Sequence, residues 1–408
     1  MGKPELISPV TEESALVRRL RENIRAYTLV LALLALWIGM AVATDGVFLA
    51  PRNMSNLFRQ TTIIGLLAIG MTFVITAGHI DLSVGSLTGL AGAIAAMMQV
   101  RWLPALAQAW GVAWLQESWV ISVIAILAAV LVGLLVGLWH GVWTAYGGVP
   151  AFIATLGGLL IFRGSILGIT RGVNIGPMEP LFRSLGQSYL STGAGVALAA
   201  VTVAAIFLMT FRARRERIRH GLPVHAAWMD GAAAALYSAL AILFVVVMNR
   251  YRGIPVPVII LIIAAMIFTF IYRRTQLGRY TWAIGGNLEA AKLSGVNVRR
   301  VTVQIFALMG LLAGLAGVIL TARLNAATAN AGNGFELDAI AACVMGGTSL
   351  AGGYGSIPGA LLGALIMASV DNGLSMLNVE SFWQQIIKGF ILMVAVLIDV
   401  RSRRAKRA

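Results

Sequence analysis

The chain has 408 residues, of which 59% are hydrophobic and 12% are charged, and its formal net charge is +15. Apolar runs of roughly 14 to 21 residues recur along its whole length, which excludes a soluble globular domain. The runs are continuous and rich in Leu, Ala, Val and Gly, whereas the strands of an outer-membrane barrel alternate with period two. We therefore expect an all-α, polytopic integral membrane protein.

Twelve apolar runs are candidates for membrane-spanning helices. They lie at residues 27–44, 61–77, 84–100, 120–139, 151–169, 191–211, 232–248, 256–272, 301–320, 337–350, 357–370 and 382–400. About twelve crossings, counted as ten plus an extra pair at 191–248, place both termini on one side of the membrane. The two shortest runs, at 337–350 and 357–370, flank a Gly-rich segment and alternatively form one re-entrant hairpin, which leaves the termini where they are. A single transmembrane domain at 27–400 is expected between a basic segment, 1–26, and a basic tail, 401–408.

The positive charges indicate how the chain is oriented. Of its 31 Lys and Arg residues, 21 lie before the first run, at 212–219, at 273–300 and after residue 400. The positive-inside rule then places both termini, and the loops at 212–230 and 273–300, in the cytosol. This distribution explains the net charge without nucleic acid as a partner. The first run has 18 residues, longer than the core of a cleavable signal peptide, so we interpret it as a retained anchor.

Catalytic and metal-binding patterns are scarce in this sequence. The single cysteine, Cys343, and four scattered histidines give no metal-ligand spacing, and no Ser-His-Asp order or nucleophile elbow stands out. A phosphate-binding P-loop needs Gly-Lys followed by Ser or Thr, and none of the four lysines has that context. We expect no enzyme and no cofactor in this chain, so if transport runs on ATP, another subunit hydrolyses it.

Polar residues interrupt the apolar runs at two places. At 78–86, Asp81 and Ser83 break a long apolar stretch; either they cap the following helix through its free N–H groups or they contact a substrate. At 346–358, glycines and Pro358 interrupt short spans, a feature that often marks a transport pathway. The candidate path for an uncharged solute comprises Asp81, Ser83, Thr348, Ser349, Ser356 and Asn372.

Charges inside the apolar runs bear on the alternative of an ion-coupled carrier. The carboxylates in or beside the runs lie near their ends rather than at their centres, which weakens that alternative. We interpret Arg163 and Lys388 as side chains that reach the membrane interface. Glycines spaced by four residues at 133–141 and 355–363 predict close helix packing.

A short polar helix is predicted in the basic loop at 273–300. It comprises Asn287, Leu288, Glu289, Ala290, Ala291, Lys292, Leu293, Ser294 and Gly295. Asn287 suits the N-cap, Glu289 lies in the first turn, where the helix dipole favours an anion, and Gly295 suits the C′ position. Without a further signal, this is a surface helix lying on the lipid headgroups.

The pattern Glu289-Ala290-Ala291-x3-Gly295 resembles the Glu-Ala-Ala loop of ABC importer permeases, whose short helix docks into the cytosolic ATPase. Three further segments strengthen the resemblance: 76–86 (TAGHIDLSVGS), 346–356 (GGTSLAGGYGS) and 371–374 (DNGL). Together they resemble the ribose/xylose class of sugar ABC importer permeases over 53–170 and 253–400. Segments 252–257 (RGIPVP), 283–287 (AIGGN) and 336–342 (ELDAIAA) are most similar to xylose-type members.

Two departures accompany the resemblance. His79 stands where the family usually has Gly or another small residue. Residues 191–248 add two spans that the ribose-type core lacks, and this pair is similar to an insertion in xylose-type members.

The resemblance implies a type II importer-like, homodimeric permease of the bacterial inner membrane. Its implied partners are a second copy of the chain, an ABC ATPase that binds ATP and Mg²⁺, a periplasmic sugar-binding protein, a monosaccharide and the lipid bilayer. Xylose is the preferred sugar, with ribose, arabinose and other monosaccharides open. The competing hypothesis is a self-sufficient secondary carrier or facilitator for a small polar solute, and a lipid-directed membrane enzyme ranks third because no catalytic constellation is present.

Overall fold

The computed structural model describes residues 12–407 apart from 223 and 225, so the first eleven residues of the basic segment 1–26 and the last residue of the tail lie outside the described residues. The α-helices are α1 (Glu12–Ala43), α2 (Pro51–Thr76), α3 (Val84–Met97), α4 (Leu103–Trp110), α5 (Ser118–Ala145), α6 (Ala151–Thr170), α7 (Pro180–Gln187), α8 (Thr192–Arg219), α9 (Ala227–Asn249), α10 (Val256–Arg274), α11 (Gln276–Gly286), α12 (Leu288–Leu293), α13 (Val298–Leu324), α14 (Phe335–Met345), α15 (Ile357–Met376) and α16 (Ser381–Arg407). A π-helical turn at Met98–Trp102 joins α3 to α4, and short 3₁₀ helices lie at Val47–Leu49 and Ala113–Gln116. Within the described chain, strand-like pairing is limited to two isolated bridges.

Ten helices in the described residues are long and apolar enough to cross a membrane. The apolar part of α1, Tyr27–Ala43, is shorter, and α14 has 11 residues, which corresponds to about 16 Å at 1.5 Å per residue. The run at 337–350 therefore does not form a spanning helix. The structure is that of a polytopic helical membrane protein with ten helices of spanning length among the described residues; the count of about twelve crossings is not confirmed, and the side of each terminus stays a prediction.

Glycine geometry explains why α14 ends early. Gly347, Gly352 and Gly353 all adopt positive φ, a region that favours glycine and ends a right-handed helix. The following helix, α15, has 20 residues and is long enough to cross on its own.

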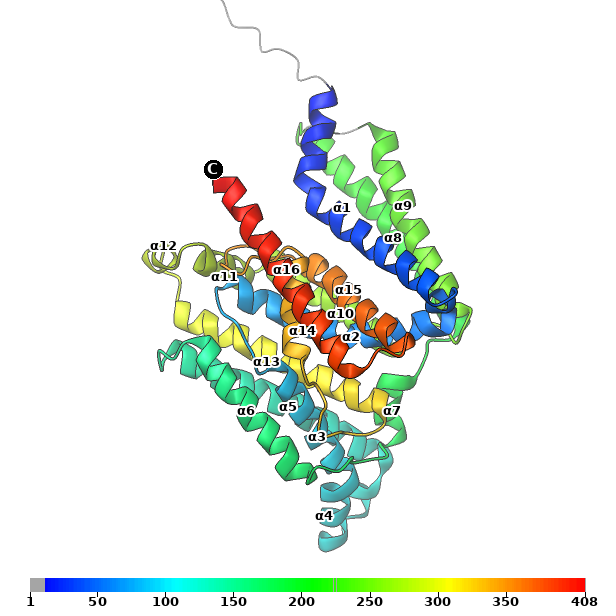
Figure 1. Cartoon of the computed structure of the whole chain (residues 1–408), viewed down its shortest axis with the longest axis vertical. Coiled ribbons are helices and arrows are strands. Elements are labelled where there is room, and N and C mark those ends of the chain that lie inside the picture. Colours follow the sequence, from blue (N-terminus) through cyan, green and yellow to red (C-terminus); the bar gives the residue numbers. More distant parts are fainter. Residues whose placement is uncertain (1–11, 223, 225, 408) are drawn as a thin grey trace, which may run out of the picture.

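Helices α2 and α13 form the centre of the molecule. In each, 83% of the most apolar window is buried inside the chain, compared with 6% in α8. Figure 1 shows α13 and α2 crossing the middle of the view, while α8 and α9 lie together at one edge beside α1. The extra pair predicted at 191–248 thus forms two peripheral helices.

The glycine stripe at 133–141 packs closely against another helix, as predicted, and the structure shows that this helix is α13. A side chain at Gly133 would meet the carbonyl oxygen of Gly310, and one at Gly137 would meet that of Phe306. In the stripe at 355–363, Gly363 lies on the backbone of Ala342 in α14 and Gly359 on that of Gly346, its C-cap, whereas Gly355 lies against side chains of α2 and α10. Small residues let these helices approach until their backbones touch.

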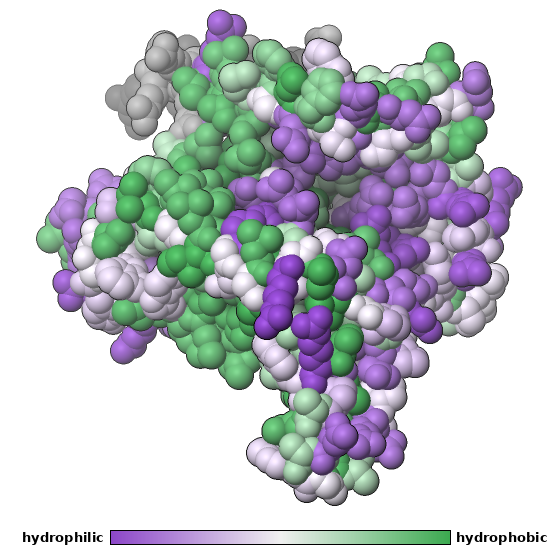
Figure 2. All heavy atoms as spheres, turned by 60° about the horizontal axis from the view of Figure 1, so that its bottom comes forward, coloured by the Kyte–Doolittle hydropathy of each residue, from purple (hydrophilic) through white to green (hydrophobic). Residues whose placement is uncertain are grey.

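The basic ends of the chain lie toward one side of the molecule. Figure 1 shows the described start of α1, the end of α16, the α8–α9 connection and α12 in the upper part of the view, with α4 at the opposite end. Figure 2 turns the lower end forward and shows hydrophilic residues around a recess, beside a broad apolar surface. We call the two ends the α12 end and the α4 end.

Candidate translocation path and docking helix

Two helices begin inside the protein, and their N-terminal ends meet. The chain leaves α2 at Thr76 and starts α3 at Val84, and it leaves α13 at Leu324 and starts α14 at Phe335. A side chain at Gly85 would overlap both the carboxylate of Glu336 and the carbonyl oxygen of Gly332. Helix N-termini carry partial positive charge, and broken helices of this kind form the central sites of many transporters.

Asp81 lies in the first of these breaks and forms a local turn. Its Oδ1 accepts hydrogen bonds from the backbone N–H of Ser83 at 2.8 Å and from the Ser83 hydroxyl at 2.7 Å. Ser83 precedes α3, and neither side chain caps that helix. The prediction that Asp81 or Ser83 caps α3 is therefore wrong. Asp81 instead accepts from an N–H two residues further on, which closes a turn within the loop.

The neighbourhood of this turn is buried and polar. Asp81 is 2% exposed, Ser83 Oγ lies 3.5 Å from His140 Nδ1, and the Thr155 hydroxyl accepts from the backbone N–H of Leu82 at 3.0 Å. His140 Nε2 and Glu336 Oε2 are buried without a hydrogen-bond partner among the described residues. These groups form a polar cluster in the centre of the molecule, which we call the central cluster.

The other predicted path residues lie elsewhere. Thr348, Ser349 and Ser356 belong to the glycine-rich loop between α14 and α15, whose Gly353 N–H donates to the Thr76 carbonyl at 2.8 Å. Thr348 is fully buried and its hydroxyl has no partner among the described residues. Ser349 pairs with Tyr354 only through its backbone N–H, and Ser356 caps α15 by accepting from Gly359 N–H at 3.2 Å.

Asn372 lies at the opposite end of α2 from this loop. Its Oδ1 accepts a hydrogen bond from Asn53 Nδ2 at 2.8 Å, and Asn53 is in the first turn of α2. The 26 residues of α2 span about 39 Å. Asn372 therefore lies far from the other five predicted path residues, and the six form no single site.

Lys388 is held by two carboxylates. Its Nζ lies 3.0 Å from Asp338 Oδ2 and 2.8 Å from Asp371 Oδ2, and Asp338 is 1% exposed. This network ties α14, α15 and α16 together, so the interpretation of Lys388 as reaching the interface is wrong. Arg163 also has partners, since its guanidinium donates to the Ala331 carbonyl at 2.9 Å. A buried charge needs such partners, and these lie too far along the chain to be identified from the sequence.

The short helix α12 has the predicted capping. Asn287 Oδ1 accepts from the Ala290 N–H at 3.0 Å, and Gly295 has φ +81°. At its other end, Val296 N–H donates to the Ala291 carbonyl at 3.1 Å and Gly295 N–H to the Lys292 carbonyl at 2.9 Å, the two bonds of a Schellman motif. Both ends of a helix of only six residues are therefore fixed by local bonds.

The C-terminal end of α12 is exposed, and its N-terminal end lines a cavity. Leu293 is 90% exposed, an unusual position for a large apolar side chain on a polar helix. Leu288, at the other end, lines a cavity of about 330 Å³ together with His79, Gly285, Arg299 and others. Burial lowers the pKa of His79 below its usual value. The α12 end therefore connects an exposed apolar tip to the loop that precedes α3.

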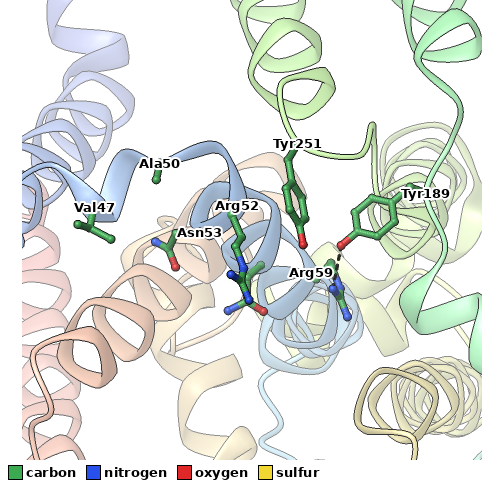
Figure 3. A pocket seen from close by; sticks show the side chains of 8 residues that line it. Val47, Ala50, Arg52, Asn53, Arg59, Tyr189 and Tyr251 are labelled. Carbon is green, nitrogen blue, oxygen red and sulfur yellow. Dashed lines mark hydrogen bonds between the residues drawn. The ribbon is translucent and has the colours of Figure 1, made fainter.

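A second cavity lies at the N-terminal end of α2, which we call its outer end, and is lined by residues that the sequence did not single out. It has a volume of about 400 Å³ and is lined by Val47, Ala50, Arg52, Asn53, Asn56, Arg59, Tyr189 and Tyr251. Figure 3 shows side chains from α2 facing the two tyrosines, which come from the segments before α8 and after α9. Arg52, Asn56 and Arg59 are spaced at i, i+4 and i+7, a polar helical stripe that could have identified this face.

Comparison with known proteins identifies the family to which this chain belongs. The family model described as branched-chain amino acid transport system / permease component matches residues 53–396. The xylose transport system permease protein XylH of Haemophilus influenzae is 46% identical over 385 residues, covering 94% of this chain and 98% of the relative. XylH of Escherichia coli is 45% identical over 382 residues, covering 94% and 93%.

Ribose permeases also match. The ribose import permease protein RbsC of Bacillus subtilis is 39% identical over 352 residues, covering 86% of each chain. No solved structure matches this chain. The family match extends over most of the described helices, so the chain belongs to this family of transport-system permease components and is a multi-pass membrane protein rather than an enzyme.

Proposed function

We propose that this chain is the permease subunit of an ATP-driven monosaccharide importer of the bacterial inner membrane, with xylose as its sugar. The observation that carries the proposal is α12, a helix capped at both ends that presents Leu293 away from the molecule. The names of the relatives support the sugar, since those 45–46% identical over 94% of the chain are xylose transport system permeases.

In this proposal α12 is the coupling helix and docks on a separate ATPase subunit that binds ATP and Mg²⁺. The positive-inside rule, applied to the basic clusters, supports a cytosolic location for α12 and both termini. A second copy of the chain and a periplasmic sugar-binding protein complete the assembly.

Movement of α12 would reach the path through the cavity beside it. Leu288 of α12 and His79 of the break between α2 and α3 line the same cavity. Thr76, at the end of α2, is bonded to Gly353 of the glycine-rich loop. A displacement of α12 would therefore act on both the segment between α2 and α3 and the glycine-rich loop. The first of these carries Asp81 and Ser83 of the central cluster.

The sugar path runs from Asn372 past Asp81 and Ser83 to Thr348, Ser349 and Ser356. The separation of Asn372 from the other five along α2 supports successive weak contacts rather than one deep site. A ligand shifts a conformational equilibrium only through its different affinity for the two states. We therefore expect a path that receives sugar on one side and releases it on the other to bind it weakly in each state.

Reconstitution tests the proposal against the self-sufficient carrier. Proteoliposomes that contain the chain with its ATPase and binding protein should accumulate labelled xylose only when ATP is present. Proteoliposomes that contain the chain alone should show no sugar flux, whereas a facilitator would equilibrate the sugar without ATP. Flux through the chain alone would overturn the ATP-driven assignment.

Gly295→Trp tests the role of α12 in the same assay. A tryptophan at φ +81° strains the C-terminal cap and places a large ring on the docking face, so ATP hydrolysis should no longer drive uptake. Gly221→Trp is a matched control, because Gly221 also has positive φ and open space but lies on the α8–α9 connection. Normal uptake by the Gly295→Trp transporter would contradict the coupling role.

A further inference from the structure

The extra helix pair, α8 and α9, contributes little to the core. Two aromatic residues lie in the segments that flank it, before the start of α8 and after the end of α9. Only 6% of the apolar window of α8 and 22% of that of α9 is buried inside the chain. Tyr189 lies three residues before α8 begins, and Tyr251 lies two residues after α9 ends. Both line the cavity at the outer end of α2.

Backbone pairing fixes the distance between these two segments. Leu190 N–H donates to the Ile254 carbonyl at 2.8 Å, and Val256 N–H donates to the Ser188 carbonyl at 3.0 Å. Gly253 makes the approach possible, because it has φ +103° and a side chain there would overlap the Leu190 carbonyl oxygen. The segments before α8 and after α9 are thus joined by a short strand-like pairing beside the cavity.

The two tyrosine rings meet edge to face above the cavity. Their centroids lie 6.0 Å apart at 83°, and the Arg252 guanidinium lies 5.8 Å from each ring centroid. Arg59 of α2 donates to the Tyr189 hydroxyl at 3.1 Å, a bond drawn in Figure 3. The rings are therefore positioned from both sides before any ligand arrives, which lowers the entropic cost of binding.

The α2 side of the cavity supplies donors and acceptors. Arg52 and Arg59 carry charge and form no ion pair with a described residue, while no carboxylate lines the cavity. Asn53 donates through Nδ2 to Asn372 and to the Phe48 carbonyl, and its Oδ1 accepts no bond from a described residue. Asn53 thus links the cavity by one hydrogen bond to Asn372 of the candidate path.

We infer that this cavity is a receiving chamber in which the ends of the extra helix pair hold a neutral monosaccharide against α2 before it enters the path. The inference rests on the proposed function and gives the pair a role in it. A volume of about 400 Å³ lies in the usual range of about 300–1,000 Å³ for small-molecule sites. The combination of ring faces, guanidinium donors and amide or phenol oxygens suits a ligand that both donates and accepts hydrogen bonds, whereas an anion would use only the donors.

Ligand-observed saturation-transfer NMR tests the chamber on the full chain in nanodiscs, without partner proteins. D-Xylose in the millimolar range should give a saturable signal with the unmodified chain. Tyr251→Ala should weaken sugar binding at least about tenfold, the equivalent of about 1.4 kcal/mol for one aromatic contact. Tyr237→Ala is the matched control, since Tyr237 is an exposed tyrosine on the same helix, α9, outside the cavity, and should bind as the unmodified chain does.

Cysteine protection gives a second measurement that does not depend on removing a ring. The only native cysteine, Cys343, is fully buried, so an Asn56→Cys chain carries one accessible thiol. Xylose should slow its modification by a membrane-impermeant thiol reagent, and it should not protect a Leu49→Cys chain, whose thiol lies outside the cavity on the same end.

The outcomes separate this inference from the proposed function. Absence of a xylose signal together with absence of protection at Asn56→Cys overturns the chamber, even where the complete transporter imports xylose. Unchanged xylose binding by Tyr251→Ala would also overturn it, because the rings would then make no contact with the sugar. Failure of the proposed function appears separately, as absent ATP-driven uptake by the unmodified complex.

Discussion

Leu293 offers the most direct test of the docking helix. The perturbation is Leu293→Ala, which removes the exposed apolar tip of α12. Alanine has the highest helix propensity, and the caps at Asn287 and Gly295 stay in place, so α12 itself should remain folded. Any loss of function then reports on what the leucine contacts outside this chain.

The expected magnitude follows from the burial of this side chain. Leu293 is 90% exposed in the isolated chain, so docking can remove nearly all of it from water. Burying a leucine side chain stabilises by about 1.5–3 kcal/mol, and the Cβ that remains in alanine retains a small part, which leaves a loss of about 2 kcal/mol. At 1.4 kcal/mol for each factor of ten, the ATPase should bind about 30-fold more weakly.

The assay is binding of the purified ATPase subunit to the permease in nanodiscs, followed by sugar-dependent ATP hydrolysis. Ile218→Ala provides the control, because Ile218 is a 57% exposed apolar residue near the basic end of α8, away from α12. The reasoning is refuted if Leu293→Ala and Ile218→Ala bind the ATPase with affinities within about twofold of each other.

Three further substitutions test the caps and the interior. Asn287→Ala removes the N-cap of α12 at a cost of about 1 kcal/mol, so hydrogen exchange of this helix should accelerate about fivefold, whereas Asn287→Asp should retain slow exchange. Lys388→Met leaves the buried Asp338 carboxylate uncompensated and should destabilise the chain by about 3–5 kcal/mol, seen as a lower unfolding temperature in nanodiscs; an unchanged temperature would mean that the ion network contributes nothing. Gly85→Ala should cost about 1–3 kcal/mol where α3 meets α14, while Gly157→Ala, in open space on α6, should cost none, and equal stability of the two would contradict the close approach.

Features that depend on residues close together in the chain could be predicted from sequence. Continuous apolar runs identify the helices because a span of about 20 residues has to be apolar throughout. The capping of α12 was also predictable, since an N-cap bonds to an N–H three residues on and a C′ glycine needs only its own φ. Glycines spaced by four residues share one helix face, so they predicted close packing, although not that the partner of Gly133 is α13.

Features that depend on contacts between distant segments were decided by the tertiary structure. Lys388 has partners 50 and 17 residues away, and no spacing rule connects positions so far apart. The extra pair acquires the role inferred for it only because the chain around Tyr189 is bonded to the chain around Pro255 beside the outer end of α2. The sequence by itself thus determined most of the long apolar helices, the positions of the basic clusters and the capped α12, because hydrophobic runs and capping are local. The broken-helix junction and both cavities arise where backbones far apart in the chain touch, which only the folded molecule decides.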